Sequence, residues 1–507
     1  MPGPGRSAYL LAAASGLVLG AAFLPGVPGA LAWVGFVPLL LALEQRVADG
    51  KPRSWFATGY VGGAVFFLVG THWIALMNDA ALTIGWLKYL GWVLGALYLA
   101  LFWAVAAWGA GWLSRRSGWA VRWTFVPVMV VVEEWRGSGD LGFPWFQPGY
   151  TQHEVLAVLQ LAALGGVTLV TAWLLVLNAA TLGLWRARTG RALALVALVL
   201  GIPVGWGAWV LRERTEPAGP LVALVQGNIP GERKWSGNHT AEILGTFVSL
   251  SDSVGLVDRP RLVVWPETAT GSYVRRVPEQ TIAVGRLAAR IGAPVYMGMA
   301  HYTWGDDARP VVWNAAGGWN PDGTLTPTYA KRHLVPFGER VPFQRWVPAL
   351  GRLELGQAEW SPGEGPVLFD GPDGAPMSML ICFESIFPDL ARQDVRAGSR
   401  LLVNITNDEW FGDGAALVQH AAMAPFRAVE NRVPVARCAN TGLTTMIDAW
   451  GVRTASLPVW QERVLVAPLP AAGAITPWTR FGDWVGGLAT LVVLLLVASP
   501  WRARGRT

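Results

Sequence analysis

The sequence predicts a polytopic α-helical membrane protein that carries a separate α/β domain outside the bilayer. Of its 507 residues, 52% are apolar and only 15% are charged, which is far from the composition of a soluble protein. About eight stretches are apolar enough to be membrane spans. The acidic residues are also unevenly distributed, since residues 1–211 hold only seven of the 34. All the other acids follow residue 212, so the chain beyond that point is more polar than the part before it.

The apolar stretches define the expected membrane spans. A bilayer core about 30 Å thick requires about 20 apolar helical residues. The candidate stretches lie near 8–25, 28–45, 55–77, 87–113, 121–135, 155–184, 192–211 and 481–499. The first of them could be a cleaved signal peptide, but further spans follow at once, so we interpret it as retained. Many of the 29 Trp residues stand beside these stretches, as expected for indole rings at a membrane interface.

The distribution of basic residues predicts the orientation of the spans. With the N-terminus inside, the cytoplasmic loops and tail hold 13 Lys and Arg residues, including Arg502, Arg504 and Arg506. The opposite short loops hold only Lys88 and Arg136. The positive-inside rule then places both termini in the cytoplasm. We therefore expect a membrane domain of seven helices (1–212), an outer domain (213–479) and a C-terminal transmembrane helix with a cytoplasmic tail (480–507).

The outer region alternates short β-rich runs with helical or loop segments. Helices are expected at Glu279–Ile291 and Ala415–Asn431. Strands are expected at Leu221–Gln226, Leu262–Trp265, Val295–Met299, Ser378–Cys382, Leu401–Ile405 and Val435–Ala439. This alternation predicts an α/β sandwich.

Three polar residues stand at or just beyond predicted strand ends, where α/β folds collect their sites. They are Glu267, Lys331 and Cys382. A Cys at the tip of a core strand is more often a small buried hydrophobe than a nucleophile. A disulfide between Cys382 and Cys438, the two cysteines of the chain, is a further alternative in an oxidising compartment.

Glu267 and Lys331 also have ordinary interpretations, since each is of a type that is usually solvated in a loop. Burial beside Trp265 would instead raise the pKa of Glu267 toward the range of a general base. A Lys beside a developing oxyanion supplies the charge stabilisation that acyl transfer needs. Composition alone does not bring the three residues together.

Four motifs together resemble the apolipoprotein N-acyltransferase family. They are Trp265-Pro266-Glu267, the run Tyr329–Glu339, Ile381-Cys382-Phe383-Glu384 and the run Asn407–Gly412. Their order and spacing, the eight spans and Gly142-Phe143-Pro144-Trp145 in an outward loop all fit that family. The resemblance covers nearly the whole chain, and the part from Lys331 to Glu339 is the most specific.

The resemblance implies a fold and a set of residue roles. The outer domain becomes an extracytoplasmic αββα nitrilase-like sandwich of the carbon–nitrogen hydrolase superfamily. Glu267 becomes the general base, Lys331 the stabiliser of the tetrahedral intermediate and Cys382 the nucleophile. Supporting roles fall to Glu339, Glu384 and Asn314. Substrate-binding positions fall on Trp235, Trp410, Phe411, Gly412, Trp145 and Phe383.

Three positions depart from the family pattern and bear on substrate preference. Glu409 stands where a small residue is usual, and Phe383 stands where Tyr is common. Gln147-Pro148 interrupts an outward loop that is usually more apolar.

The implied reaction is a two-step, ping-pong acyl transfer through a Cys382 thioester. The donor would be a membrane phospholipid, phosphatidylethanolamine by the resemblance. The acceptor would be the α-amine of the diacylglyceryl-cysteine of an apolipoprotein. We expect no metal, because the six His residues lack ligand-like spacing, and we expect no cofactor and no nucleic-acid partner. The chain would act as a monomer in the bacterial inner membrane, with its catalytic domain on the periplasmic side.

Two rival functions remain open at this stage. A membrane-tethered amidase or nitrilase would use the same triad with water as the second nucleophile. A transporter with a non-catalytic outer domain would need ionisable groups within its spans. Glu133-Glu134, inside the short fifth stretch, is the one pair that fits, and we interpret it as an early helix end.

Overall fold

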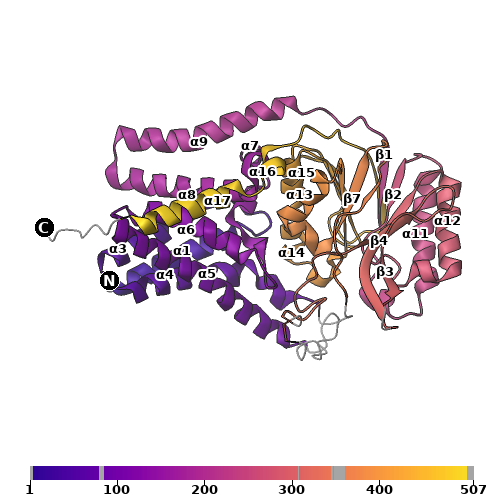
Figure 1. Cartoon of the computed structure of the whole chain (residues 1–507), viewed down its shortest axis with the longest axis horizontal. Coiled ribbons are helices and arrows are strands. Elements are labelled where there is room, and N and C mark those ends of the chain that lie inside the picture. Colours follow the sequence, from indigo (N-terminus) through magenta and orange to yellow (C-terminus); the bar gives the residue numbers. More distant parts are fainter. Residues whose placement is uncertain (1–3, 79–84, 306–307, 344–345, 348–359, 500–507) are drawn as a thin grey trace. The chain divides into compact units, whose positions relative to one another are not determined.

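The computed structural model describes residues 4–78, 85–305, 308–343, 346–347 and 360–499 (Figure 1). The chain divides into two units. One comprises Met1–Met77, Trp86–Glu213 and Phe481–Thr507, and the other comprises Asn78–Gly85 and Arg214–Arg480. The basic tail residues Arg502, Arg504 and Arg506, and most of the expected outward loop 78–88, lie outside the described residues.

The first unit is entirely helical. Its α-helices are α1 (Pro4–Ala21), α2 (Ala32–Gly35), α3 (Val37–Ala48), α4 (Pro52–Gly70), α5 (Leu87–Ser117), α6 (Val121–Arg136), α7 (Leu156–Leu159), α8 (Ala162–Ala187), α9 (Gly190–Val210) and α17 (Trp484–Ala498). Among the described residues, five helical segments are long and apolar enough to cross a membrane: Gly29–Ala48, Pro52–Leu76, Leu87–Ser117, Ala162–Ala187 and Gly190–Glu213. Arg6–Ala21 and Trp484–Ala498 are shorter apolar helices. The structure thus supports a polytopic helical unit, and the full count of eight spans stays a prediction.

Small residues let the helices of this unit approach closely. A Cβ atom added to Gly59 of α4 would lie 2.4 Å from the carbonyl oxygen of Trp103 on α5. A Cβ atom on Gly16 of α1 would lie 2.2 Å from the carbonyl oxygen of Gly62 on α4. Because apolar helices in lipid gain little from burying more apolar surface, such close backbone packing is a main source of their association.

The two acids of α6 lie in its last turn and have partners. Both oxygens of Glu133 accept from the guanidinium of Arg136, and neither side chain is exposed. Glu134 accepts from the hydroxyl of Thr168 at 2.6 Å and from the amide of Gln147 at 3.3 Å. Arg136 therefore balances the charge of Glu133, while Glu134 is held by neutral donors.

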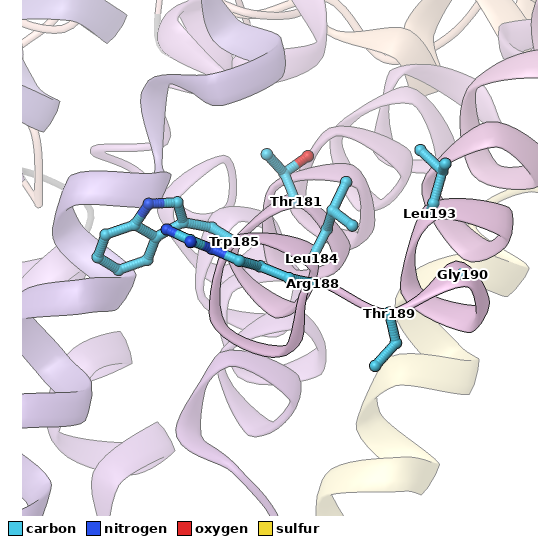
Figure 2. A pocket seen from close by; sticks show the side chains of 7 residues that line it. All are labelled: Thr181, Leu184, Trp185, Arg188, Thr189, Gly190 and Leu193. Atoms are coloured by element: carbon cyan, nitrogen blue, oxygen red, sulfur yellow. The ribbon is translucent and has the colours of Figure 1, made fainter.

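The expected sixth span, 155–184, is interrupted. The short helix α7 precedes α8, and Gly165 and Gly166 inside α8 have non-helical backbone angles. Beyond α8, a shallow open recess lies at the turn into α9 (Figure 2). Its lining contains no acid and no cysteine and consists of Thr181, Leu184, Trp185, Arg188, Thr189, Gly190 and Leu193.

The second unit is built on two six-stranded sheets. The first has the order β12-β1-β2-β3-β4-β5 and the second the order β11-β10-β9-β8-β7-β6. The strands are β1 (Leu221–Gln226), β2 (Leu262–Val264), β3 (Val295–Trp304), β4 (Pro310–Trp319), β5 (Tyr329–Ala330), β6 (Leu368–Asp370), β7 (Pro376–Ile381), β8 (Leu401–Thr406), β9 (Val435–Ala439), β10 (Thr445–Ile447), β11 (Arg453–Ser456) and β12 (Arg463–Pro468). Within each sheet the three central strands β1-β2-β3 and β7-β8-β9 run parallel.

Helices cover the outer face of each sheet (Figure 1). The helices α11 (Thr240–Gly255) and α12 (Pro278–Ile291) form one core with the first sheet, in which Phe247 stacks on Trp265 with ring centroids 5.0 Å apart. The helices α13 (Pro388–Arg396) and α15 (Ala424–Asn431) form another core with the second sheet. Because β1 also contacts β9 of the other sheet, the layers stack as helix, sheet, sheet, helix. The unit is a nitrilase-like sandwich.

All six strands expected from the sequence are present. The expected helix at Ala415–Asn431 is wrong in one respect, since it is two helices, α14 (Ala415–Ala421) and α15. Pro425 opens α15, and a proline lacks the amide N–H that a continuous helix would need there. The sequence analysis did not anticipate β4, β5, β6, β10, β11 and β12, most of which are short or partly exposed.

Replacing Phe247 with Ala should destabilise the sandwich. The ring is fully buried against Trp265, so its removal leaves a cavity and should cost about 3–5 kcal/mol. Thermal unfolding of the purified protein in detergent should show a clearly lower Tm. The matched control is Val257→Ala at a side chain that is 77% exposed, which should leave the Tm almost unchanged. Equal Tm values for the two variants would contradict the assigned core.

Candidate active site

Glu267 is positioned by the strand before it and by a close approach of backbone. It follows β2 after Trp265 and Pro266, and its side chain is only 8% exposed. On the neighbouring strand β3, Gly298 donates its N–H to the carbonyl of Pro266. A Cβ atom on Gly298 would lie 2.5 Å from the Cα of Glu267. A side chain at position 298 would therefore push Glu267 out of place.

The carboxylate of Glu267 is held by three donors. The side-chain amide of Asn314 on β4 donates to Oε1 at 2.8 Å, and the Lys331 ammonium lies 3.5 Å from the same oxygen. The backbone N–H of Asn407, which follows β8 in the other sheet, donates to Oε2 at 2.8 Å. These contacts fix the carboxylate between the two sheets.

Lys331 forms an ion pair with two carboxylates. Its ammonium lies 2.8 Å from Glu339 and 3.5 Å from Glu267, and its side chain is buried. Burial lowers the pKa of Lys331, but the charges of Glu339 and Glu267 outweigh burial and hold that pKa above its ordinary value. Lys331 is therefore a cation at neutral pH.

Glu339 also ties the loop that carries Lys331. Its carboxylate accepts from the amide of Asn314 at 3.0 Å and from the backbone N–H of Val335 at 2.9 Å. The structure thus brings Glu267, Lys331, Glu339 and Asn314 into one hydrogen-bonded cluster.

Cys382 follows β7 and begins the short 3-10 helix Cys382–Ile386. Its backbone lies in the left-handed region, with φ +52°, which is uncommon for a residue with a side chain. Both cysteines are free thiols, so the alternative of a Cys382–Cys438 disulfide is wrong for this structure. Cys438 instead donates its thiol to the carbonyls of Val225 and Val264 within the core.

The protonation of Cys382 is governed by burial and by its charged neighbours. Burial raises the pKa of the thiol well above its ordinary value, the charge of Glu267 raises it further, and the charge of Lys331 lowers it. The thiol is therefore protonated at neutral pH and needs a base to become a nucleophile. Glu267 is near enough for its charge to act on the thiol, and it is the candidate for that base.

Glu384 braces the backbone on either side of the cluster. It is fully buried and accepts from the N–H of Ile381, which precedes the cysteine, at 2.7 Å. It also accepts from the N–H of Arg332, which follows Lys331, at 2.6 Å and from the Tyr329 hydroxyl at 2.7 Å. Glu384 thus links the segments that carry Cys382 and Lys331.

The expected substrate-binding residues fall into three groups. Trp235 and Trp410 are large exposed aromatics of the sandwich, and Phe411 and the turn residue Gly412 follow Trp410. Phe383 is buried and packs edge-on against Phe387 with ring centroids 5.3 Å apart. Trp145 is buried in the helical unit, stacked on Phe143, and so does not belong to the unit that holds the cluster.

Two contributors to the site were missed from the sequence. One is the backbone N–H of Asn407, which donates to Glu267. Nearly every residue type has a backbone N–H, so the sequence gives no sign of this role. The other is Lys234, whose side chain is fully buried, with the charges of Glu409 and Glu267 acting on it. Burial lowers the pKa of Lys234 to about 8 despite those carboxylates. The one hint of this contribution in the sequence was that Lys234 stands next to Trp235, an expected substrate-binding residue. Across the described residues, no group of three or more His, Cys, Asp or Glu is arranged to hold a metal ion.

Comparison with known proteins identifies the family. A family model for carbon–nitrogen hydrolases matches residues 221–476. An apolipoprotein N-acyltransferase from Geobacter metallireducens is 35% identical to the chain, over 96% of this chain and 95% of the relative. The chain belongs to the apolipoprotein N-acyltransferase family. A model of the N-terminal domain of these N-acyltransferases also matches residues 15–180.

Further apolipoprotein N-acyltransferases give the same result. The relative from Caulobacter vibrioides is 34% identical over 95% of this chain and 91% of its own length. The relative from Chlorobaculum tepidum is 32% identical over 97% of this chain and 96% of its own length. Among solved structures, an amidase from Nesterenkonia sp. matches 51% of this chain and 92% of its own, at 18% identity and a TM-score of 0.39. The chain is thus a membrane N-acyltransferase of the carbon–nitrogen hydrolase superfamily.

The raised thiol pKa predicts how Cys382 reacts with a small alkylating reagent. In a Cys438→Ala background, the rate of alkylation by iodoacetamide should still be rising above pH 9, since the thiolate is the reactive form. In Lys331→Met the curve should shift to still higher pH, because the cation that favours the thiolate is lost. The measurement is the alkylated fraction by intact mass as a function of time and pH. A rate that levels off below pH 9 would contradict the raised pKa.

Proposed function

We propose that this chain transfers a fatty acyl chain from a membrane phospholipid to the α-amine of the N-terminal diacylglyceryl-cysteine of an apolipoprotein. The observation that carries the proposal is the buried cluster of Glu267, Lys331 and Glu339, in which the charges of Glu267 and Lys331 act on the Cys382 thiol, in a chain with five helical segments long and apolar enough to cross a membrane among its described residues. The names of the relatives point to the same acceptor. Both proposed substrates carry lipid chains, so the enzyme has to meet them at a membrane, and the helical unit keeps it there.

In the first half-reaction Glu267 takes the thiol proton and the Cys382 sulfur attacks an ester carbonyl of the phospholipid. A bond forms between sulfur and the carbonyl carbon, and the carbonyl oxygen gains the negative charge. The Lys331 ammonium stabilises this oxyanion. When the intermediate collapses, the ester oxygen leaves with the proton held by Glu267. The products are a lysophospholipid and a Cys382 thioester.

In the second half-reaction the free amine of the apolipoprotein attacks the thioester carbonyl. Glu267 accepts the proton that the amine loses, and Lys331 again stabilises the oxyanion. The sulfur leaves and regains a proton from Glu267. The amide product and the free thiol restore the starting enzyme, so no other reactant is consumed.

The roles of the remaining residues follow from their contacts. Asn314 and the N–H of Asn407 keep the Glu267 carboxylate oriented, while Glu339 holds the Lys331 ammonium. The exposed rings of Trp235 and Trp410 suit contact with acyl chains, which are apolar. We assign phosphatidylethanolamine as the donor and the monomer as the active form, in line with the family resemblance.

Intact mass of the purified enzyme after incubation with phosphatidylethanolamine tests the first half-reaction. The wild type should gain the mass of a fatty acyl group that hydroxylamine removes. Cys382→Ser should lose this hydroxylamine-labile adduct, while the matched control Cys438→Ser should keep it. A hydroxylamine-labile adduct that survives in Cys382→Ser would overturn the assigned nucleophile.

Variants of the base and the cation test the two polar roles. Glu267→Gln and Lys331→Met should each lower the rate of acyl-enzyme formation by about 10²–10³-fold, since each removes one contribution to the transition state. The exposed Glu279→Gln on α12 is the control and should react like the wild type. With a diacylglyceryl-cysteine peptide added, mass spectrometry should find N-acylated peptide. Release of free fatty acid in its place would favour the amidase-like function with water as acceptor.

The location proposed for the sandwich is the periplasmic face of the inner membrane, with both termini in the cytoplasm. A Cys introduced at Val257, which is exposed in the sandwich, should react with a membrane-impermeant maleimide in intact spheroplasts. A Cys introduced at Asp49, in the basic loop between α3 and α4, should react only after the membrane is opened. The reverse pattern would invert the proposed orientation.

A further inference from the structure

A fully buried ionic cluster contacts the backbone of Cys382. It consists of Asp408, His420 and Arg437, none more than 1% exposed. Asp408 lies 2.9 Å from Nδ1 of His420 and 2.8 Å from the Arg437 guanidinium. Burial would raise the pKa of Asp408, but the charges of Arg437 and His420 outweigh it and hold that pKa below its ordinary value. The carboxylate is therefore ionised and anchors the imidazole ring.

The other ring nitrogen of His420 reaches the backbone of Cys382. Nε2 lies 3.0 Å from the Ser385 hydroxyl and 3.2 Å from the Cys382 carbonyl oxygen, and that hydroxyl donates to the same carbonyl at 3.0 Å. Since the carbonyl can only accept and the hydroxyl proton is used on it, both contacts require a proton on Nε2. His420 thus supports the peptide group of the nucleophile directly and through Ser385.

This contact acts on a backbone conformation that needs support. Cys382 has φ +52°, and a residue with a side chain stays in this strained region only when the surrounding structure holds it there. The N–H of Ile381 is held by Glu384 on one side, and the Cys382 carbonyl is held by Ser385 and His420 on the other. The conformation is therefore fixed from both ends.

The cluster is continuous with the contacts of the base. Asp408 follows Asn407, whose N–H binds Glu267 at 2.8 Å. Gly442 packs closely against the Asp408 side chain, since a Cβ atom added there would lie 2.1 Å from its carboxylate. One short segment after β8 thus orients Glu267 through a peptide N–H and Cys382 through His420.

We propose that His420, oriented by Asp408, is a positioning residue that holds the Cys382 main chain so that the thiol faces Glu267 and Lys331. The inference rests on the proposed function, in which Cys382 carries the acyl group. His420 exchanges no proton with the substrate and touches no reacting atom. Its contribution is the alignment of the sulfur with its base, and small misalignments of reacting groups cost about 10²-fold in rate.

The test compares two replacements of His420 by single-turnover acylation. His420→Leu removes the donor to the Cys382 carbonyl and should slow thioester formation by about 10²-fold. His420→Gln places an amide N–H near the position of Nε2 and should recover the rate to within about tenfold of the wild type. The apparent KM for phosphatidylethanolamine should be the same in all three proteins. The control is His239→Leu, at a partly exposed His that pairs with Glu242. It should form the thioester at the wild-type rate.

Stability measurements separate positioning from folding. The Tm of each variant is measured beside its acylation rate. The acylation rate of His420→Gln should exceed that of His420→Leu by more than the difference between their Tm values can account for. Should His420→Leu fail to fold, Asp408→Asn takes its place, because it keeps the shape of the side chain while removing the charge that binds the imidazole ring and the Arg437 guanidinium. Equal acylation rates in Leu and Gln variants, or in Asp408→Asn and wild type, would overturn the positioning role. A wild-type enzyme that forms no thioester would instead refute the proposed function.

Discussion

The rest of the active site depends on the carboxylate of Glu267, which is bound from both sheets at once. Asn314 and Lys331 reach it from the first sheet, and the N–H of Asn407 reaches it from the second. An ionised carboxylate buried this deeply is tolerated only when its oxygens are hydrogen-bonded and a cation is near. The same contacts that make burial possible also fix the direction in which the base points.

The nucleophile is under a complementary constraint. Burial keeps the Cys382 thiol protonated, so its reactivity is linked to the presence of a correctly placed base. Its backbone is held in the left-handed region by Glu384 on one side and by Ser385 and His420 on the other. The site is therefore preorganised by buried hydrogen bonds, which suits a reaction whose charge develops mainly on one carbonyl oxygen.

The helical unit is held together mainly by close packing of apolar helices, whereas the active site depends on a cluster of buried ionic contacts. Its helices are apolar and pack through small residues such as Gly59 and Gly16, where a side chain would collide with the neighbouring backbone. Its buried acid Glu133 pairs with Arg136 three residues later, whereas Asn178 of α8 bonds the distant backbone of Ala32 and Phe36.

The sequence by itself determined the class of the protein, half of the strands of the sandwich and the identity of Glu267, Lys331 and Cys382 as candidates. These signals are local, since hydrophobic runs, turn residues and motifs are read along the chain. The tertiary structure decided what no local pattern contains: that Asn407 offers its N–H to Glu267, that Lys234 is buried, that Cys438 is no disulfide partner, and that Asp408 and His420 support Cys382. Each of these depends on segments far apart in sequence meeting across the two sheets, and packing alone sets that geometry.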